Sequence, residues 1–256
     1  MSYYNQYSYK SVPYPSRSKP AATVSSSGCG VCSMCMVVEA LTGKTVTPQT
    51  MAKYSIKVGA RLNSGTDMHT LGKAAAERWG LTMTTSSDIA DVLAAVRQGG
   101  VVIANVGGDH GSYKGLFSNG GHYVAVVGMH REQLVVWDPG QYDGKYSTSA
   151  RAGRLQAVGH DLRVLPSILD ADCSTRSPRY YIFERRDHVT QADFDRMMDD
   201  WLARRAQEPP SGWAVPELTR AVELGITDGT RPQSYATRQE VAVMLTRAID
   251  REDPNE

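Results

Sequence analysis

SSSGCGVCSMCMVVEALTG, residues 25–43, is the stretch of the chain that decides the fold. It is apolar on nearly every side, a pattern typical of a helix buried in the centre of a domain. We expect the helix to span residues 29–42, with Ser26 or Ser27 as its N-cap and Gly43 closing it. The sequence therefore predicts a fold organised around a central helix near its N-terminus.

Cys29 lies in the first turn of that predicted helix. Backbone N–H groups and the positive end of the helix dipole stabilise an anion there, so the pKa of the thiol should be lowered. Gly28 and Gly30 on either side would let the backbone of a substrate approach closely. These features favour a nucleophilic cysteine, but the local pattern fits a small buried helix residue equally well.

The spacing C-x-x-C-x-x-C raises zinc binding and a redox pair as alternatives. Positions three and six residues on are rotated by roughly 300° and 600° on one helix, so the sulfurs converge poorly on a tetrahedral metal. No second C-x-x-C follows, and no strand precedes the first as in a thioredoxin-like site. We interpret Cys32 and Cys35 as core residues and Cys173 as a bystander in a polar loop. We expect no metal and no other cofactor.

A predicted hairpin supplies a base for the thiol. The strand HYVAVVGM begins at His122, and the strand EQLVVWDP carries Asp138 near its end. With the turn centred near His130, residues whose numbers sum to about 260 face each other, with Cβ atoms about 5 Å apart. This register places His122 opposite Asp138. A carboxylate there fixes the tautomer of the imidazole and stabilises the imidazolium, as in a catalytic triad.

Three further positions complete the candidate site. Gln6, in YYNQYSY, carries an amide that can donate to an oxyanion together with the backbone N–H of Cys29. The Gly-rich loop 107–121 leads into the histidine strand. We expect His110 and Gly121 of this loop to line the substrate cleft.

The order of the elements, helices first and then an antiparallel sheet, indicates an α+β fold. The remaining helices and strands of this domain are expected at 66–79, 87–97, 100–106 and 179–185, with further short strands between 150 and 186.

The chain divides into three parts by pattern. Residues 1–186 form the α+β domain, and its first 28 residues are expected to wrap onto it as an irregular arm. Residues 187–212 read as an amphipathic helix followed by a Pro-rich linker. Residues 213–256 read as a small helical module.

Bulk composition excludes several classes of protein. The 256 residues, 41% of them hydrophobic, suffice for one catalytic core and a small appendage. A net charge of +1, from 28 basic and 27 acidic residues, gives no electrostatic reason to expect binding to nucleic acid or an anionic membrane. No apolar run of about 18 residues predicts a membrane span, and the first residues lack the apolar core of a secretory signal. The clustered cysteines suit a reducing compartment.

YNQ, a Ser-rich stretch, GCG opening a helix, GGHYVAVVG and a strand ending in DP together resemble papain-like peptidases related to bacteriocin leader-processing peptidases. The resemblance covers roughly residues 3–186. It implies a papain-like fold with Gln6 as oxyanion donor, Cys29 as nucleophile, His122 as base and Asp138 as orienting acid. The chain departs from the family in having Val-Cys-Ser after GCG, where Pro-Thr-Ser is common.

The tail resembles a single S-layer homology-type repeat, a module that binds secondary cell-wall polymers and usually occurs in threes. The matching features are Trp213, Ala221, GITDG at 225–229, Pro232 and TRQE at 237–240. A single copy leaves weak polymer binding, self-association through the repeat and mere support of the fold as alternatives.

A cysteine peptidase joined to such a module, without a signal peptide, resembles a phage endolysin. This combination implies hydrolysis of amide bonds in bacterial peptidoglycan, after accumulation in the host cytoplasm and release to the wall. Three alternatives stay open: a peptidase that processes proteins or leader peptides, a non-catalytic wall-binding or virion-associated protein, and an acyl transferase.

Overall fold

The computed structural model describes residues 2–186 and 190–252, and it divides the chain into two compact units, Met1–His188 and Val189–Glu256. The boundary expected at residue 187 lies outside the described residues. The helix expected in the linker segment falls in the second of these units. Of the helices in the described ranges, none has the length and apolar content needed to cross a bilayer.

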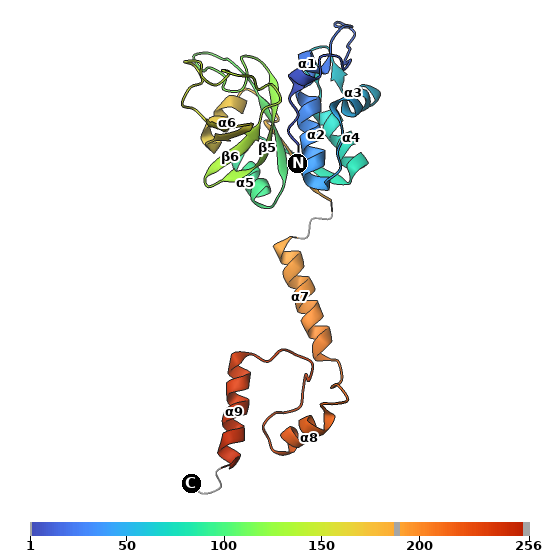
Figure 1. Ribbon diagram of the computed structural model, residues 1–256, viewed down its shortest axis with the longest axis vertical. Helices are drawn as coiled ribbons and strands as arrows, with labels where there is room; N and C mark the ends of the chain where they lie inside the picture. Colours follow the sequence, from blue (N-terminus) through green and yellow to red (C-terminus); the bar gives the residue numbers. More distant parts are fainter. Residues whose placement is uncertain (1, 187–189, 253–256) are drawn as a thin grey trace. The chain divides into compact units, whose positions relative to one another are not determined.

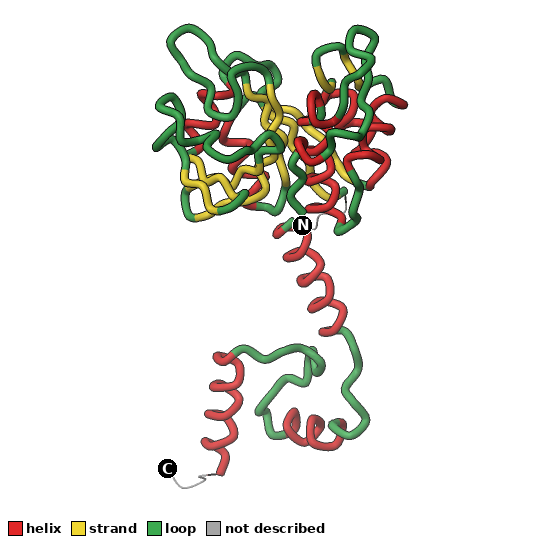
Figure 2. The backbone as a smooth tube through the Cα atoms, turned by 45° about the horizontal axis from the view of Figure 1, so that its top comes forward, coloured by secondary structure: helices red, strands yellow, loops and turns green. Residues whose placement is uncertain are grey.

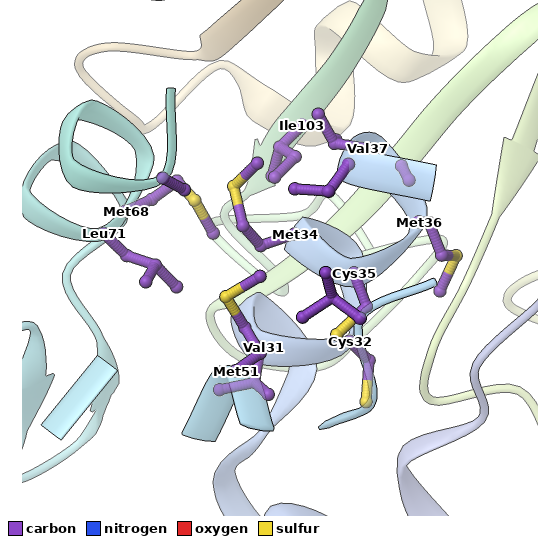
Figure 3. Packing of buried hydrophobic residues seen from close by; sticks show 14 of the residues in the cluster. Val31, Cys32, Met34, Cys35, Met36, Val37, Met51, Met68, Leu71 and Ile103 are labelled. Carbon is purple, nitrogen blue, oxygen red and sulfur yellow. The ribbon is translucent and has the colours of Figure 1, made fainter. Parts of the chain in front are cut away.

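The central helix α2 (Cys29–Thr42) has the bounds that the sequence predicts, and nearly all of it is buried. Figure 3 shows side chains from several of its turns packed in one apolar cluster with Met51, Met68, Leu71 and Ile103. Gly43 ends the helix in the left-handed conformation, with φ of 71°. Only glycine adopts that conformation without a steric penalty, so the C-terminal stop is confirmed.

The expected serine cap of α2 is wrong. Gly28 precedes the helix, and no side chain caps it. The serines instead belong to a short helix of their own, α1 (Val24–Ser27), in which Ser26 forms a capping box with Thr23. The first N–H groups of α2 are therefore free of a competing serine oxygen.

Seven strands form one antiparallel sheet, which confirms the α+β fold (Figure 1). The sheet order is β3 (Leu81–Ser86), β9 (Tyr180–Arg185), β4 (Val101–Val106), β5 (His122–His130), β6 (Gln133–Trp137), β8 (Asp161–Val164) and β7 (Gln156–Val158). A separate two-stranded sheet pairs β1 (Arg61–Leu62) with β2 (Gly65–Thr66).

Helices cover both faces of the large sheet (Figures 1 and 2). One core lies between the sheet and α2, α3 (Pro48–Lys57) and α4 (Met68–Trp79), and it includes Ile103 and Phe183. The other core lies toward α5 (Ile89–Arg97) and α6 (Pro166–Cys173), and it includes Val102 and Val124. Alternate residues of β4 enter opposite cores because side chains alternate along a strand.

The segment between residues 150 and 186 differs from its sequence prediction. The segment expected to hold only short strands contains α6, which begins with Pro166, a residue well suited to the first turn of a helix. Cys173 ends that helix fully buried, so it is a core residue rather than a bystander in a loop.

The N-terminal arm lies on the domain, as expected. It contains the helical turn η1 (Gln6–Ser8) and ends with α1. Tyr14 is fully buried, and its hydroxyl makes hydrogen bonds with Ser55 and Thr66. These bonds fasten the arm to α3 and β2.

The C-terminal unit contains α7 (Gln191–Ala206), α8 (Val215–Glu223) and α9 (Arg238–Glu252). Thr190 and Thr237 cap α7 and α9 by accepting hydrogen bonds from backbone N–H groups of Asp193 and Glu240. Of the described residues of α7 and α8, none is buried.

Candidate active site

Cys29 is half-buried at the start of α2, whereas the other three cysteines are buried. A Cβ added to Gly28 would come within 2.5 Å of the Val24 carbonyl oxygen, and one on Gly30 would come within 2.9 Å of Thr66. Glycine at both positions therefore allows the chain to turn from α1 into α2 and to pack on β2. These contacts place the sulfur at the helix tip.

His122 and Asp138 meet, but not in the register that the sequence predicts. β5 and β6 pair Ala125 with Trp137, which would set Asp138 opposite Val124 rather than His122. His122 lies diagonally across from Asp138 on the same face, and its Nε2 is 2.6 Å from Asp138 Oδ1.

The cause of the shifted register is the turn. Its two residues are Arg131 and Glu132, because His130 still pairs with Gln133. Arg131 takes a φ of 56°, and a bulge between Val126 and Gly128 shifts the pairing by one residue. The predicted turn at His130 was thus too early.

The Asp138 carboxylate accepts hydrogen bonds from three further groups that the sequence analysis missed. The backbone N–H of Gly140 is 2.7 Å from Oδ1, and Lys145 Nζ and the Tyr146 hydroxyl are each 2.5 Å from Oδ2. All three follow in the segment after Asp138, which has no regular periodicity. The only sequence signal was Asp-Pro-Gly, a typical turn.

Charge and burial fix the protonation state of this carboxylate. Asp138 is fully buried, which by itself would raise its pKa. His122 and Lys145, by charge and hydrogen bond, outweigh burial and hold the pKa of Asp138 well below its usual range. Burial and the charge of Asp138 raise the pKa of Tyr146, so the phenol remains a donor.

The thiol and the imidazole shift each other's pKa in opposite directions. Burial raises the pKa of Cys29, but the charge and hydrogen bond of His122, with the backbone N–H groups of Tyr123 and Gly30, leave it below its ordinary value. Burial lowers the pKa of His122, but Asp138 and Cys29 raise it to about 9. Both shifts favour transfer of the thiol proton to the imidazole, and because Nε2 faces Asp138, Nδ1 is left for the sulfur.

Gln6 is held between α1 and the segment after Asp138. Its backbone N–H donates to the Pro139 carbonyl at 2.7 Å, and its side-chain Nε2 donates to the Ser25 carbonyl at 2.9 Å. The neighbouring Asn5 donates to the Gln141 carbonyl at 2.7 Å. Since one Nε2 hydrogen is used on Ser25, the second is left to donate to an oxyanion.

Two residues of the Gly-rich loop, His110 and Gly121, are expected to line the substrate cleft. His110 bonds the Gly108 carbonyl and Ser174 and stacks on Tyr113, and within the described residues no hydrogen bond or ring contact joins it to the triad. A Cβ on Gly121 would come within 2.3 Å of the Arg176 guanidinium. Gly121 thus admits Arg176 beside the entry to β5, while His110 stabilises its own loop.

The N-terminal part of the chain, which holds this site, matches a known protein family. Residues 1–157, which contain Gln6, Cys29, His122 and Asp138, match the Peptidase_C39 like family. The chain belongs to this family. Its members are cysteine peptidases, so the family and the cysteine–histidine–aspartate arrangement agree on the class of chemistry.

Two solved peptidase structures are similar to the chain at low identity. One, from Bacillus anthracis, is 14% identical, with 69% of this chain and 96% of that chain covered and a TM-score of 0.43. Another is the peptidase domain of Streptococcus ComA, a bifunctional ABC transporter involved in a quorum-sensing pathway. It is 16% identical, with 60% and 88% covered and a TM-score of 0.37. No curated protein sequence matches the chain.

The remaining cysteines of this C39-like chain are poor nucleophiles. Burial raises the pKa values of Cys32, Cys35 and Cys173, so these thiols stay protonated at neutral pH. Across residues 2–186 and 190–252, no cluster of His, Cys, Asp and Glu side chains is placed to hold a metal ion. Reactivity is therefore expected at Cys29 alone.

Proposed function

We propose that this chain hydrolyses amide bonds in the peptide part of peptidoglycan and acts as a phage endolysin. The observation that carries the reaction is the buried His122–Asp138 pair, 2.6 Å from Nε2 to Oδ1, with a histidine whose charge lowers the pKa of the Cys29 thiol. Membership of a cysteine peptidase family supports the same reaction class.

In the proposed reaction, the Cys29 thiolate attacks the carbonyl carbon of the scissile amide. Gln6 Nε2 and the Cys29 N–H donate hydrogen bonds to the resulting oxyanion. His122 gives its proton to the leaving amine, which leaves a thioester on Cys29. His122 then takes a proton from water, the hydroxide attacks the thioester, and the thiolate leaves. Asp138 stays ionised and holds the imidazole in place.

The proposed wall target is supported by the tail. Residues quoted for its resemblance to an S-layer homology repeat, including Asp228, Pro232 and Glu240, line one cavity of about 520 Å³ in the C-terminal unit. Thr227, Arg231 and Gln239 add hydrogen-bonding groups to the same wall. A polar cavity of this kind suits a secondary cell-wall polymer. In this proposal the protein collects in the host cytoplasm and reaches the wall at lysis.

Mass spectrometry of muropeptides tests the proposal. Purified Gram-positive walls are digested with the full chain, with Cys29→Ala, and with Cys32→Ala as a matched control from the same helix. We expect new amino groups with the wild type and with Cys32→Ala, and none with Cys29→Ala.

Other outcomes would assign a different function. Intact walls but cleaved test peptides would favour the protein- or leader-processing alternative. A Cys29 that shows no selective reaction with a thiol-directed probe would favour the non-catalytic alternative, because a lowered pKa predicts fast labelling. Capture of the acyl group by an added amine in preference to water would favour the acyl transferase.

A further inference from the structure

A cavity of about 540 Å³ lies beside the triad, lined by side chains of the Gly-rich loop and of the segment after Asp138. It reaches the site through Lys145, which lines it and bonds Asp138. Tyr7 lines it from the N-terminal arm, next to Gln6. The cavity is therefore joined, through Lys145, to the carboxylate that orients His122.

Four charged side chains line the cavity, and three of them are already paired. Lys145 faces the Asp138 carboxylate. Lys114 pairs with Asp109 at 3.2 Å, and the second oxygen of Asp109 accepts the Gly115 N–H. The lining of the cavity therefore carries one positive charge that is not paired, and this charge is that of Arg151.

Arg151 is only 8% exposed, yet its hydrogen bonds go to neutral oxygens. Its Nε donates to the Gly115 carbonyl at 3.2 Å, and its Nη2 donates to the Asn119 side chain. In the described part of the chain, no group accepts a hydrogen bond from Nη1. The Asp109 carboxylate acts on this guanidinium by charge but accepts no hydrogen bond from it, so the rigid fork of Arg151 is left to match a further carboxylate.

We propose that Arg151 binds a carboxylate of the peptide substrate, which makes this cavity an acid-selective subsite. The inference rests on the proposed role of Cys29 as nucleophile. A peptide can offer this anion at its C-terminus or on an acidic side chain, and both present the same two oxygens to the guanidinium.

The test uses iodoacetyl-glycine peptides of increasing length, each made with a free C-terminal carboxylate and as the neutral carboxamide. The Cys29 thiolate displaces iodide and forms a thioether, so the labelling rate measures how well each peptide occupies the site. At the length that spans the cavity, we expect the acid to label about tenfold faster than the amide, the size of effect that one charge-assisted hydrogen bond provides.

Variants separate binding from folding. Arg151→Gln should remove the preference for the acid, and Arg151→Lys should keep part of it because the charge remains. Arg154→Gln is the matched control, since Arg154 bonds Tyr113 and the Lys114 carbonyl but does not line the cavity. A purely structural role for Arg151 would slow the acid and the amide equally, which leaves their ratio unchanged.

The outcomes are distinct. Equal labelling by acid and amide at every length overturns the subsite, as does a preference that survives Arg151→Gln. If Cys29 resists every probe, the proposed nucleophile itself fails, and the subsite falls with it. A further pair, iodoacetyl-Gly-Glu-amide and iodoacetyl-Gly-Gln-amide, shows whether a side-chain carboxylate serves as well as a chain end.

Discussion

The two units of the chain differ in where their apolar side chains lie. In the N-terminal unit, large residues such as Met34 and Phe183 are fully buried. In the C-terminal unit, Trp213, Tyr235 and Ile249 are mostly exposed, and no described residue of α7 or α8 is buried. The first unit has the rigid packing that can hold a catalytic geometry, whereas the second relies on local interactions within its helices.

The helices of the two units illustrate the same difference. α2 has no side-chain cap and is stabilised by burial on nearly every side. α7 has a capping box at Thr190 but buries nothing. Packing therefore stabilises the first helix, and local hydrogen bonds stabilise the second.

The largest contrast is expected between two phenylalanines. Phe183→Ala leaves a void in the core, so the free energy of unfolding should fall by about 4 kcal/mol. Phe194, which is 50% exposed on α7, is the matched site in the other unit. Phe194→Ala should change the free energy of unfolding by no more than about 0.5 kcal/mol. Urea unfolding followed by circular dichroism measures both. A large loss for Phe194→Ala would break the comparison.

The next contrast is between two lysines of the N-terminal unit that both pair with an aspartate. The side chain of Lys145 is 6% exposed, and Lys145→Met removes one partner of a buried pair, so unfolding should become easier by about 3 kcal/mol at neutral pH. The side chain of Lys114 is 60% exposed. Lys114→Met should leave stability unchanged because water screens that pair. Equal effects in urea unfolding would show that burial is not what distinguishes the two pairs.

His122→Ala tests the electrostatics of the site. Without the imidazolium, only the backbone N–H groups of Tyr123 and Gly30 oppose burial, so the pKa of the thiol rises and alkylation of Cys29 by iodoacetamide at pH 7 should slow by about 100-fold. The pH dependence of alkylation in the wild type follows from the same pKa shifts. Because the pKa of Cys29 is lowered and that of His122 is raised to about 9, the ion pair persists between the two values.

The behaviour of the enzyme above pH 9 gives an independent check on the role of His122. Above about pH 9, His122 loses its proton, so peptide hydrolysis should decline while alkylation of the thiolate continues. The pKa shift of His122 likewise stabilises the fold below its ordinary pKa of 6.5, and this contribution is lost as the pH rises through 9. Parallel loss of hydrolysis and alkylation above pH 9 would contradict the assignment.

The smallest effect is expected at a helix cap of the C-terminal unit. Thr190→Ala removes the side-chain acceptor of the Asp193 N–H and should cost α7 about 1 kcal/mol, seen as a loss of helical circular dichroism. Thr190→Ser keeps the acceptor and serves as control. An unchanged spectrum for Thr190→Ala would mean that something other than the cap stabilises α7.

Much of the fold could be predicted because its signals are local. The bounds of α2 follow from an apolar run ended by Gly43, and β5 and β6 follow from alternation. His122 and Asp138 came together despite a wrong register, since a diagonal pair on one face is still within reach of an imidazole.

The remaining contacts of the site could not be predicted from local sequence patterns. Lys145 and Tyr146 follow a turn in a segment without periodicity, so nothing in the sequence linked them to Asp138. His110 has partners at Ser174 and Tyr113 that no sequence pattern indicates. Such contacts depend on where a loop folds back in space, and this information is spread over the whole domain.

The tie between the N-terminal arm and the segment after Asp138 sets the order in which the enzyme can become active. During synthesis Gln6 leaves the ribosome early, but the carbonyls of Pro139 and Gln141 that hold the arm come more than a hundred residues later. Until then the thiol lacks both its histidine and its amide donor. A nascent chain therefore carries an inert cysteine, and proteolytic capability appears only when the domain is nearly complete.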